Sequence, residues 1–144
     1  MNLEVGQAAT RELTVTPAMV RSYAEIPGDY NPLHFDGEVA SRTRFDRLIA
    51  QGGIAMGLLH ALVAMDLPDA EAVFTKQDWT FPSPVYIGDT ICAEGRVVSV
   101  HRRLPMAEME CTVTNQAGAE VLKGTATVFQ AEPKGLTGPG RLAK

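Results

Sequence analysis

The hydrophobic and polar positions in the second half of the chain predict four strands, at residues 73–81, 90–101, 106–115 and 120–130. The third run shows the pattern best, because its apolar side chains alternate strictly with glutamates and threonines: Ala107, Met109, Cys111 and Val113 against Glu108, Glu110, Thr112 and Thr114. A period of two gives a strand one buried and one solvent-facing side, as in antiparallel sheets. The pattern therefore predicts four antiparallel strands.

Turn-forming residues separate these runs. The sequence from Gln116 to Gly118 is typical of a tight hairpin turn, and Gly88 opens a turn into the second run. Pro82 and Pro84 follow the first run, and proline removes a hydrogen-bond donor from a strand. We therefore expect a bend or a sheet edge there.

The first half of the chain is predicted to contain a short strand at residues 10–15 and then a helix. Thr16 is a favourable N-cap, and Pro17 suits the first helical position. The helix is expected to end near Ile26, because a Pro-Gly pair follows it. Asp36 is expected to cap a further short helix.

A longer apolar segment at residues 49–65 predicts the central helix of the domain. It is apolar on nearly every side, and a helix with that pattern is buried rather than lying on a surface. Gly52 and Gly53 lie near its start, where free backbone N–H groups and the helix dipole favour negative charge. We therefore expect an α+β architecture, with a long antiparallel sheet wrapped around a long buried apolar helix.

The length of 144 residues suits one domain with a proper core. We expect this single domain to cover residues 1–131. Residues 132–144 are rich in proline and glycine, which is typical of a flexible C-terminal tail.

Composition excludes several classes of partner. The formal net charge is −4, whereas nucleic-acid-binding domains are usually basic. No apolar run reaches the roughly 18 residues that span a bilayer, and the N-terminus lacks a signal-peptide pattern. Cys92 and Cys111 fall in predicted strands and are typical of core fillers rather than of a disulfide or metal pair. We therefore expect no nucleic acid, no membrane association, and a reducing, cytoplasmic setting.

The segment from Asp29 to His34 holds a carboxylate and an imidazole five positions apart across Pro32. The two side chains cannot be neighbours on one helix face, because that requires a spacing of three or four and a continuous helix. A loop can instead point both at one spot, and a carboxylate that orients or charges a histidine is a common acid/base pair. The structural alternative is a capping Asp, an Asn-Pro turn and an exposed His.

Three stretches of the chain resemble the MaoC-like hydratase/dehydratase family, and within it the R-specific enoyl-CoA hydratases. They are residues 28–36, the Gln51-Gly52 start of the apolar helix, and residues 81–89 ahead of the long strand. The resemblance extends from about residue 15 to 129. It implies a hot-dog fold, in which the sheet wraps the apolar helix. It also implies homodimers or dimer-based oligomers with sites built across the subunit interface.

The resemblance also implies an activity and its residues. The activity is that of a lyase, the reversible addition of water to a trans-2-enoyl-CoA to give a (3R)-hydroxyacyl-CoA. Asp29 and His34 match the catalytic pair, which would activate the water. Gly52 matches the glycine whose backbone N–H supports the thioester oxygen, and a helix N-terminal N–H suits a developing oxyanion. Coenzyme A enters only as part of the substrate, and we expect no metal or other cofactor.

The remaining site candidates each have two interpretations. Asn31 either shapes the loop through an Asx turn or takes part in chemistry, and Tyr30 either lines the acyl pocket or simply packs. Gln51 stands where many family members have His, so the helix entrance is expected to form different hydrogen bonds. His60 stands where many carry a small polar residue. It is either a satisfied core group or a pocket group that favours a short or polar acyl chain.

A basic rim is expected near the mouth of the substrate tunnel, because coenzyme A carries phosphates. Most Arg and Lys side chains are simply solvated surface, so no single one is assigned. The candidates are Arg42, Arg44, Arg47, Lys76, Arg102 and Arg103.

Two other functions stay open. A hot-dog acyl-CoA thioesterase would hydrolyse the thioester, and the fold alone does not separate the two activities. Such an enzyme would more often place its carboxylate on or beside the central helix, yet no Asp or Glu lies between Gln51 and Asp66. A non-catalytic acyl-binding subunit would tolerate the loss of Asp29 or His34, but this chain has both.

Overall fold

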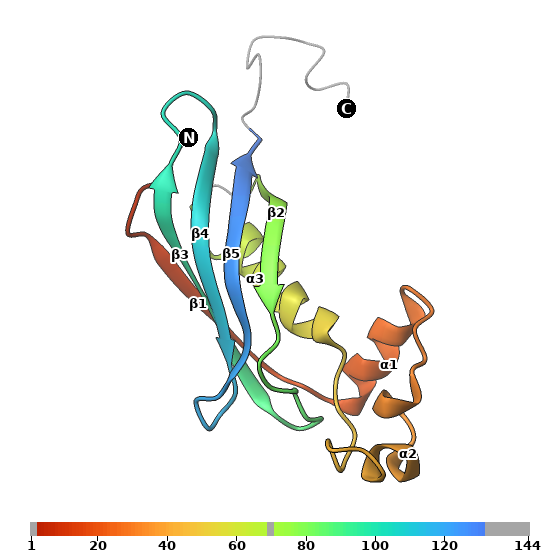
Figure 1. Cartoon of the computed structure of the whole chain (residues 1–144). Coiled ribbons are helices and arrows are strands. Elements are labelled where there is room, and N and C mark those ends of the chain that lie inside the picture. Colours follow the sequence, from red (N-terminus) through yellow and green to blue (C-terminus); the bar gives the residue numbers. More distant parts are fainter. Residues whose placement is uncertain (1–2, 69–70, 132–144) are drawn as a thin grey trace.

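Five strands form one antiparallel sheet in the computed structural model, which describes residues 3–68 and 71–131 (Figure 1). In chain order they are β1 (Ala8–Thr14), β2 (Ala72–Thr80), β3 (Thr90–Val100), β4 (Met106–Thr114) and β5 (Glu120–Gln130). Their spatial order is β1-β3-β4-β5-β2, with every neighbouring pair antiparallel. The predicted strands are therefore confirmed, each with ends within two residues of those expected.

The alternation along β4 is confirmed in detail. Its four apolar side chains are buried, whereas Glu108 and Glu110 are exposed. The hairpin into β5 turns at Gly118, whose φ of +82° is a left-handed conformation that suits glycine. Asn115 closes this turn, because its Oδ1 accepts hydrogen bonds from the N–H groups of Ala117 and Ala119 at 3.0 Å.

Helix α1 (Pro17–Glu25) begins and ends as its sequence predicts. Thr16 caps it, because its Oγ1 accepts a hydrogen bond from the N–H of Met19 at 3.2 Å. Beyond the helix, Gly28 takes a φ of +82°, and its N–H donates back to the Ala24 carbonyl at 2.8 Å. This turn ends α1 and directs the chain into the loop that carries Asp29.

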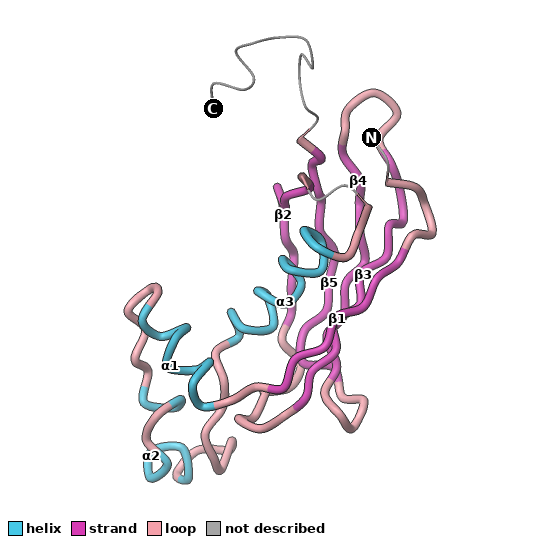
Figure 2. The backbone as a smooth tube through the Cα atoms, turned by 180° about the vertical axis from the view of Figure 1, so that it is seen from behind, coloured by secondary structure: helices cyan, strands magenta, loops and turns pink. Residues whose placement is uncertain are grey.

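Two short helical segments follow that loop: the 3-10 turn η1 (Pro32–His34) and helix α2 (Gly37–Ser41). Asp36 caps α2 as predicted, because its Oδ1 accepts hydrogen bonds from the N–H groups of Glu38 and Val39 at 3.0 and 3.3 Å. Helices α1 and α2 lie together beyond one end of the sheet, whereas the β3–β4 hairpin lies at the opposite end (Figures 1 and 2).

The central helix α3 (Gly52–Met65) packs along one face of the sheet (Figure 2). Its sheet-facing side is buried and comprises Ala55, Leu58, Leu59, Leu62 and Val63. The expectation that α3 is buried on every side is wrong, because Gly57, His60 and Met65 are exposed. The sheet of one chain covers only one side of the helix, so an apolar stripe stays open on the other.

The remaining expectations concern the cysteines and the C-terminal segment. Both cysteines are free, with Cys111 buried and Cys92 half-buried. Within the part of the chain that the structure describes, no helix has the length and apolar character needed to cross a membrane. The tail expected at residues 132–144 lies outside the described residues.

Candidate active site

The loop between α1 and α2 presents Asp29 to solvent. The backbone N–H of Asp29 donates to the Ala24 carbonyl at 3.0 Å, which fixes the residue at the end of α1. Its Oδ1 accepts a hydrogen bond from the N–H of Asn31 at 3.2 Å. An ionised carboxylate accepts several hydrogen bonds, so the remaining oxygen positions of Asp29 can bind a water or a substrate group.

Asn31 shapes this loop, as one of its two interpretations predicted. Its Oδ1 accepts a hydrogen bond from the N–H of Leu33 at 3.0 Å and so caps the η1 turn. Pro32 occupies the first position of that turn, where its missing N–H has no consequence. The loop conformation that carries Asp29 and His34 therefore follows from residues inside the loop.

His34 is only 8% exposed, and its orientation is set by the backbone. Its Nδ1 lies 2.7 Å from the carbonyl oxygen of Ile49. A carbonyl only accepts hydrogen bonds, so Nδ1 carries the hydrogen and the neutral ring has its lone pair on Nε2. Ile49 is itself held, because its N–H donates to the Leu33 carbonyl and it forms a bridge with Tyr86. The ring is thus prepared to accept a proton at Nε2.

The expected pairing of Asp29 with His34 is only partly realised. The two residues share one loop, but among the described residues no hydrogen bond joins their side chains. The group that orients the imidazole is the carbonyl of Ile49, which lies 15 positions further along the chain. The alternative of an ordinary exposed histidine is wrong, because the ring is buried.

The N-terminus of α3 provides uncapped backbone N–H groups. Gln51 is the N-cap residue, but its side chain makes no capping hydrogen bond. Its Nε2 donates instead to the Val20 carbonyl of α1 at 3.0 Å, which ties the two helices together. Its Oε1 is buried and has no hydrogen-bond partner among the described residues. The first amides of α3, beginning at the exposed Gly52, are therefore available to an anionic oxygen.

Aromatic rings flank both glycines at this helix start. A Cβ at Gly53 would overlap the hydroxyl end of the Tyr23 ring, so a side chain there would require that ring to move. A Cβ at Gly52 would lie 3.1 Å from the Phe81 ring. Sequence reasoning did not place Tyr23 or Phe81 at the site. The Gly-Gly pair was the available signal, because two glycines at a helix start indicate a close approach by another group.

Two cavities open beside these residues. His34 lines a cavity of about 430 Å³, together with Pro17, Val20, Arg21, Phe35, Arg47, Leu48 and Ile87. Gly52 lines a smaller one of about 210 Å³, whose walls include Phe45, Phe81 and the prolines that follow β2. The sequence-predicted residues are thus gathered at one end of the molecule, but His34 and Gly52 line separate cavities.

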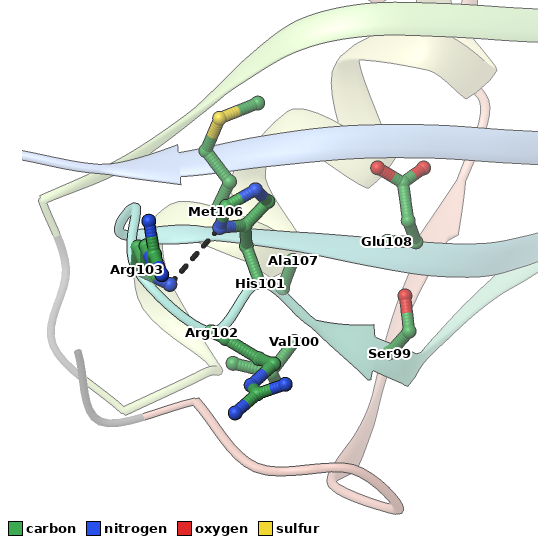
Figure 3. A pocket seen from close by; sticks show the side chains of 8 residues that line it. All are labelled: Ser99, Val100, His101, Arg102, Arg103, Met106, Ala107 and Glu108. Carbon is green, nitrogen blue, oxygen red and sulfur yellow. Dashed lines mark hydrogen bonds between the residues drawn. The ribbon is translucent and has the colours of Figure 1, made fainter.

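A larger cavity of about 530 Å³ lies at the β3–β4 hairpin (Figure 3). It is lined by Ser99, Val100, His101, Arg102, Arg103, Met106, Ala107 and Glu108. Figure 1 places this hairpin at the opposite end of the sheet from α1 and α2. Arg102 and Arg103, two of the candidates for a basic rim, therefore lie far from His34 in the same chain.

The other candidate side chains near the loop have clear positions. Tyr30 is 60% exposed and packs against Phe35, with ring centroids 5.9 Å apart, so it packs at the surface. His60 is exposed, and its ring meets Phe74 at a centroid distance of 4.8 Å. The interpretation of His60 as a satisfied core group is therefore wrong. Because α3 is apolar on nearly every side, the sequence did not show that His60 lies on the side of the helix that the sheet leaves open.

The basic candidates near the loop differ in what they contact. Arg42 pairs with Glu38 at 3.5 Å, and Arg44 lies over Phe45. Arg47 stacks on Tyr86, with its guanidinium carbon 3.8 Å from the ring centroid. The structure adds Arg21, which the sequence did not indicate, because a helix residue facing a cavity looks like any other surface arginine.

Comparisons with known proteins identify relatives of this chain. The chain is 33% identical over 127 residues to the (R)-specific enoyl-CoA hydratase of Aeromonas caviae, covering 88% of this chain and 95% of that protein. It is 35% identical over 128 residues to the 3-hydroxybutyryl-CoA dehydratase of Methylorubrum extorquens, covering 88% of this chain and 80% of the relative.

Solved structures give the same result. The (R)-hydratase of A. caviae, described as involved in PHA biosynthesis, superposes with a TM-score of 0.85 at 32% identity, over 90% of this chain and 98% of that chain. The unliganded R-hydratase of Pseudomonas aeruginosa superposes with a TM-score of 0.82 at 32% identity, over 90% of this chain and 83% of that chain. The expected hot-dog fold, with the sheet packed on one central helix, is thereby confirmed. The model of the MaoC-like domain matches residues 3–120, and this chain belongs to that family.

Proposed function

We propose that this protein is a lyase that adds water reversibly across the double bond of a trans-2-enoyl-CoA to give a (3R)-hydroxyacyl-CoA. The observation that carries the proposal is the Nδ1 hydrogen bond of His34 to the Ile49 carbonyl, which leaves Nε2 as a proton acceptor. It occurs in a chain that is 33% identical to an (R)-specific enoyl-CoA hydratase. The same reaction run backwards is a dehydration, as in the name of the Methylorubrum relative.

In the proposed mechanism, Asp29 and His34 hold and activate one water molecule. The water oxygen bonds to C3 of the enoyl group, its proton passes to the base, and C2 receives a proton. Negative charge collects on the thioester oxygen as C3 is attacked. In this proposal, the uncapped N–H of Gly52 at the start of α3 stabilises that charge. The sequence of steps involves no net oxidation or reduction, so the proposal includes coenzyme A only as part of the substrate.

We propose that Asn31 and Gln51 position these groups rather than react. Asn31 fixes the loop through its hydrogen bond to Leu33, and Gln51 fixes the start of α3 against α1. Tyr30 packs on Phe35 beside the loop and would border the entrance of the substrate.

His60 is proposed to limit the acyl group to a short or polar chain. The open side of α3 runs from Gly52 past Gly57, which has free space around it, to His60. The eight steps from Gly52 to His60 correspond to a rise of roughly 12 Å along the helix. An acyl chain that follows this stripe would meet the imidazole. Replacing His60 by Ser should shift the preference toward longer enoyl-CoAs, and an unchanged chain-length preference would remove His60 from this role.

We propose that the working form is a homodimer or a dimer-based oligomer in the cytoplasm. Strand β2 pairs only with β5 among the described strands, so its other edge is open. Val73 on this strand is 54% exposed, and the open side of α3 lies beside it. A second copy would cover both apolar surfaces. Light scattering on the purified protein tests this, and a monomer at micromolar concentration would contradict it.

The function is tested by following the enoyl-thioester absorbance of crotonyl-CoA together with a thiol assay for free coenzyme A. Loss of the enoyl band without thiol release is the expected result. Thiol release would identify a thioesterase instead. Absence of both signals with short, branched and carboxylated enoyl-CoAs would point to a non-catalytic acyl-binding subunit.

The Asp29→Asn variant tests the mechanism within this function. Removing the carboxylate that helps to hold and activate the water should lower turnover by roughly a hundredfold or more while the circular dichroism spectrum stays unchanged. Asp36→Asn is the matched control, because Asp36 lies in the same region but only caps α2. Normal turnover in folded Asp29→Asn would remove this carboxylate from the mechanism.

A further inference from the structure

The cavity beside His34 has a one-sided charge. Among its eight lining residues are two arginines, Arg21 and Arg47, and no aspartate or glutamate. Its volume of about 430 Å³ is in the range of small-molecule sites, which is about 300–1,000 Å³. A cavity of this kind attracts anions, because nothing in its wall neutralises the two guanidinium groups.

Arg47 is held in place although it is exposed. Its guanidinium lies 3.8 Å from the centroid of the Tyr86 ring, a close cation–π contact. Tyr86 is anchored at both ends, because its hydroxyl donates to the Phe45 carbonyl at 2.9 Å and its N–H donates to Asp89 at 3.0 Å. A solvated surface arginine rarely has such a fixed platform. The side chain therefore loses little freedom when an anion binds.

The backbone beside Arg47 has a special conformation. Asp46 has a φ of +69°, and among the described residues it is the one residue other than glycine with a positive φ. This left-handed conformation stands immediately before Arg47 in the chain. Such positions cost free energy and cluster at functional sites.

Among the described residues, neither guanidinium of the cavity forms an ion pair. Arg11, Arg42 and Arg96 each form an ion pair with a carboxylate 3.1–3.5 Å away. Within residues 3–68 and 71–131, Arg21 and Arg47 have no such partner. The positive charges of the cavity are thus free for a ligand.

We infer that Arg47, assisted by Arg21, forms an anion subsite that holds an acidic group of the thioester substrate beside His34. Guanidinium groups bind phosphates and carboxylates through paired hydrogen bonds. On an enoyl-CoA, that group is either a phosphate of coenzyme A or a carboxylate at the far end of the acyl chain. The inference rests on the proposed function and names the residues that recognise its substrate.

The test compares wild type with Arg47→Ala on three substrates: crotonyl-CoA, crotonyl-pantetheine, and an enoyl-CoA with a terminal carboxylate. Losing a charged hydrogen bond should raise KM about tenfold or more while kcat changes little. A rise for both coenzyme A substrates but not for the pantetheine thioester identifies a phosphate. A rise for the carboxylated substrate alone identifies an acyl carboxylate. Arg47→Lys keeps the charge without the planar fork and should be intermediate.

Two results would overturn the inference: an unchanged KM for all three substrates, or an equal change for all three, which indicates a general structural effect. Arg96→Ala is the control, because Arg96 is exposed on β3 and pairs with Glu94. If wild type itself hydrates none of the substrates, the proposed function fails. The subsite is then tested by calorimetry, with free coenzyme A and the carboxylated acyl-pantetheine as ligands. If wild type and Arg47→Ala bind each ligand with equal affinity, the subsite is excluded.

Discussion

His34 and His101 lie at opposite ends of the molecule, and the backbone gives their rings opposite tautomers. At His34, Nδ1 lies 2.7 Å from a carbonyl oxygen, so Nδ1 carries the hydrogen and Nε2 accepts. At His101, Nδ1 accepts hydrogen bonds from the N–H groups of Arg103 and Leu104 at 3.1 and 3.0 Å. In the neutral His101 ring, the hydrogen is therefore on Nε2. Of these two histidines, His34 is the one whose proton acceptor is not used by the backbone.

The cavities beside His34 and His101 also differ in a way that separates the two ends of the molecule. The hairpin cavity beside His101 is the larger, at about 530 Å³ against about 430 Å³. Its histidine is exposed, whereas His34 is buried and Arg47 is stacked on an anchored ring. Volume alone would have selected the end of the molecule opposite to the candidate site. The differences that matter are the tautomer and the burial of each histidine ring.

The largest expected effect is the difference in kcat between variants that lack the His34 ring and variants that lack the His101 ring. His34→Gln should lower kcat for crotonyl-CoA by roughly a hundredfold or more, because glutamine cannot take the proton from water. His101→Gln should leave kcat unchanged, because that ring only braces a hairpin turn. Steady-state kinetics on both variants, with circular dichroism to check folding, measure the difference. Equal losses in the two variants would remove the distinction between the two ends.

The next largest effect is on the free energy of unfolding, which we expect to change in opposite directions when two glycines of α3 are replaced by alanine. Gly53→Ala places a Cβ against the Tyr23 hydroxyl and should lower the free energy of unfolding by about 1–3 kcal/mol. Gly57→Ala meets nothing within 4 Å. It should raise the free energy of unfolding by up to about 1 kcal/mol, because alanine favours a helix. Urea unfolding of the two variants gives both values.

A double variant identifies the cause of the first loss. Adding Tyr23→Ala to Gly53→Ala removes the ring that the new Cβ meets. The double variant should then lose less than the sum of the two single losses. Strict additivity would show that the tyrosine ring is not what restricts position 53.

Much of the fold was predictable because the signals are local. The N-caps Thr16 and Asp36, the hairpin at Gly118 and the alternation along β4 each depend on neighbours within a few residues. Each was expected from the sequence and is present in the structure. The loop position of Asn31 follows the same rule, since its partner is two residues away.

The parts that were missed depend on contacts between distant segments. His34 bonds to a carbonyl 15 positions away, and Arg47 stacks on Tyr86 in a different part of the chain. Neither contact leaves a periodic pattern in the sequence. His60 was misplaced for a related reason: its helix is apolar all round, so the sequence did not show which side the sheet leaves open.

The smallest effect at working pH concerns Cys111, deep in the sheet. Burial raises the pKa of its thiol from 9.0 to about 12. Between these values the thiol ionises in the unfolded chain but stays neutral in the folded one. The unfolded state then binds fewer protons, so the free energy of unfolding should fall as pH rises from about 9 toward 12, by at most about 1.4 kcal/mol per pH unit.

Chemical unfolding at several pH values tests this interior contribution. Below pH 9 the stabilisation is fully present, so Cys111→Ala should differ from wild type there only by the lost side-chain packing. Above pH 9 the variant should lose stability less steeply than wild type, because it has no thiol at this position to titrate. Cys92→Ala retains Cys111 and is the reference. If the free energy of unfolding depends on pH in the same way for wild type and Cys111→Ala, the Cys111 thiol is reached by solvent in the folded protein.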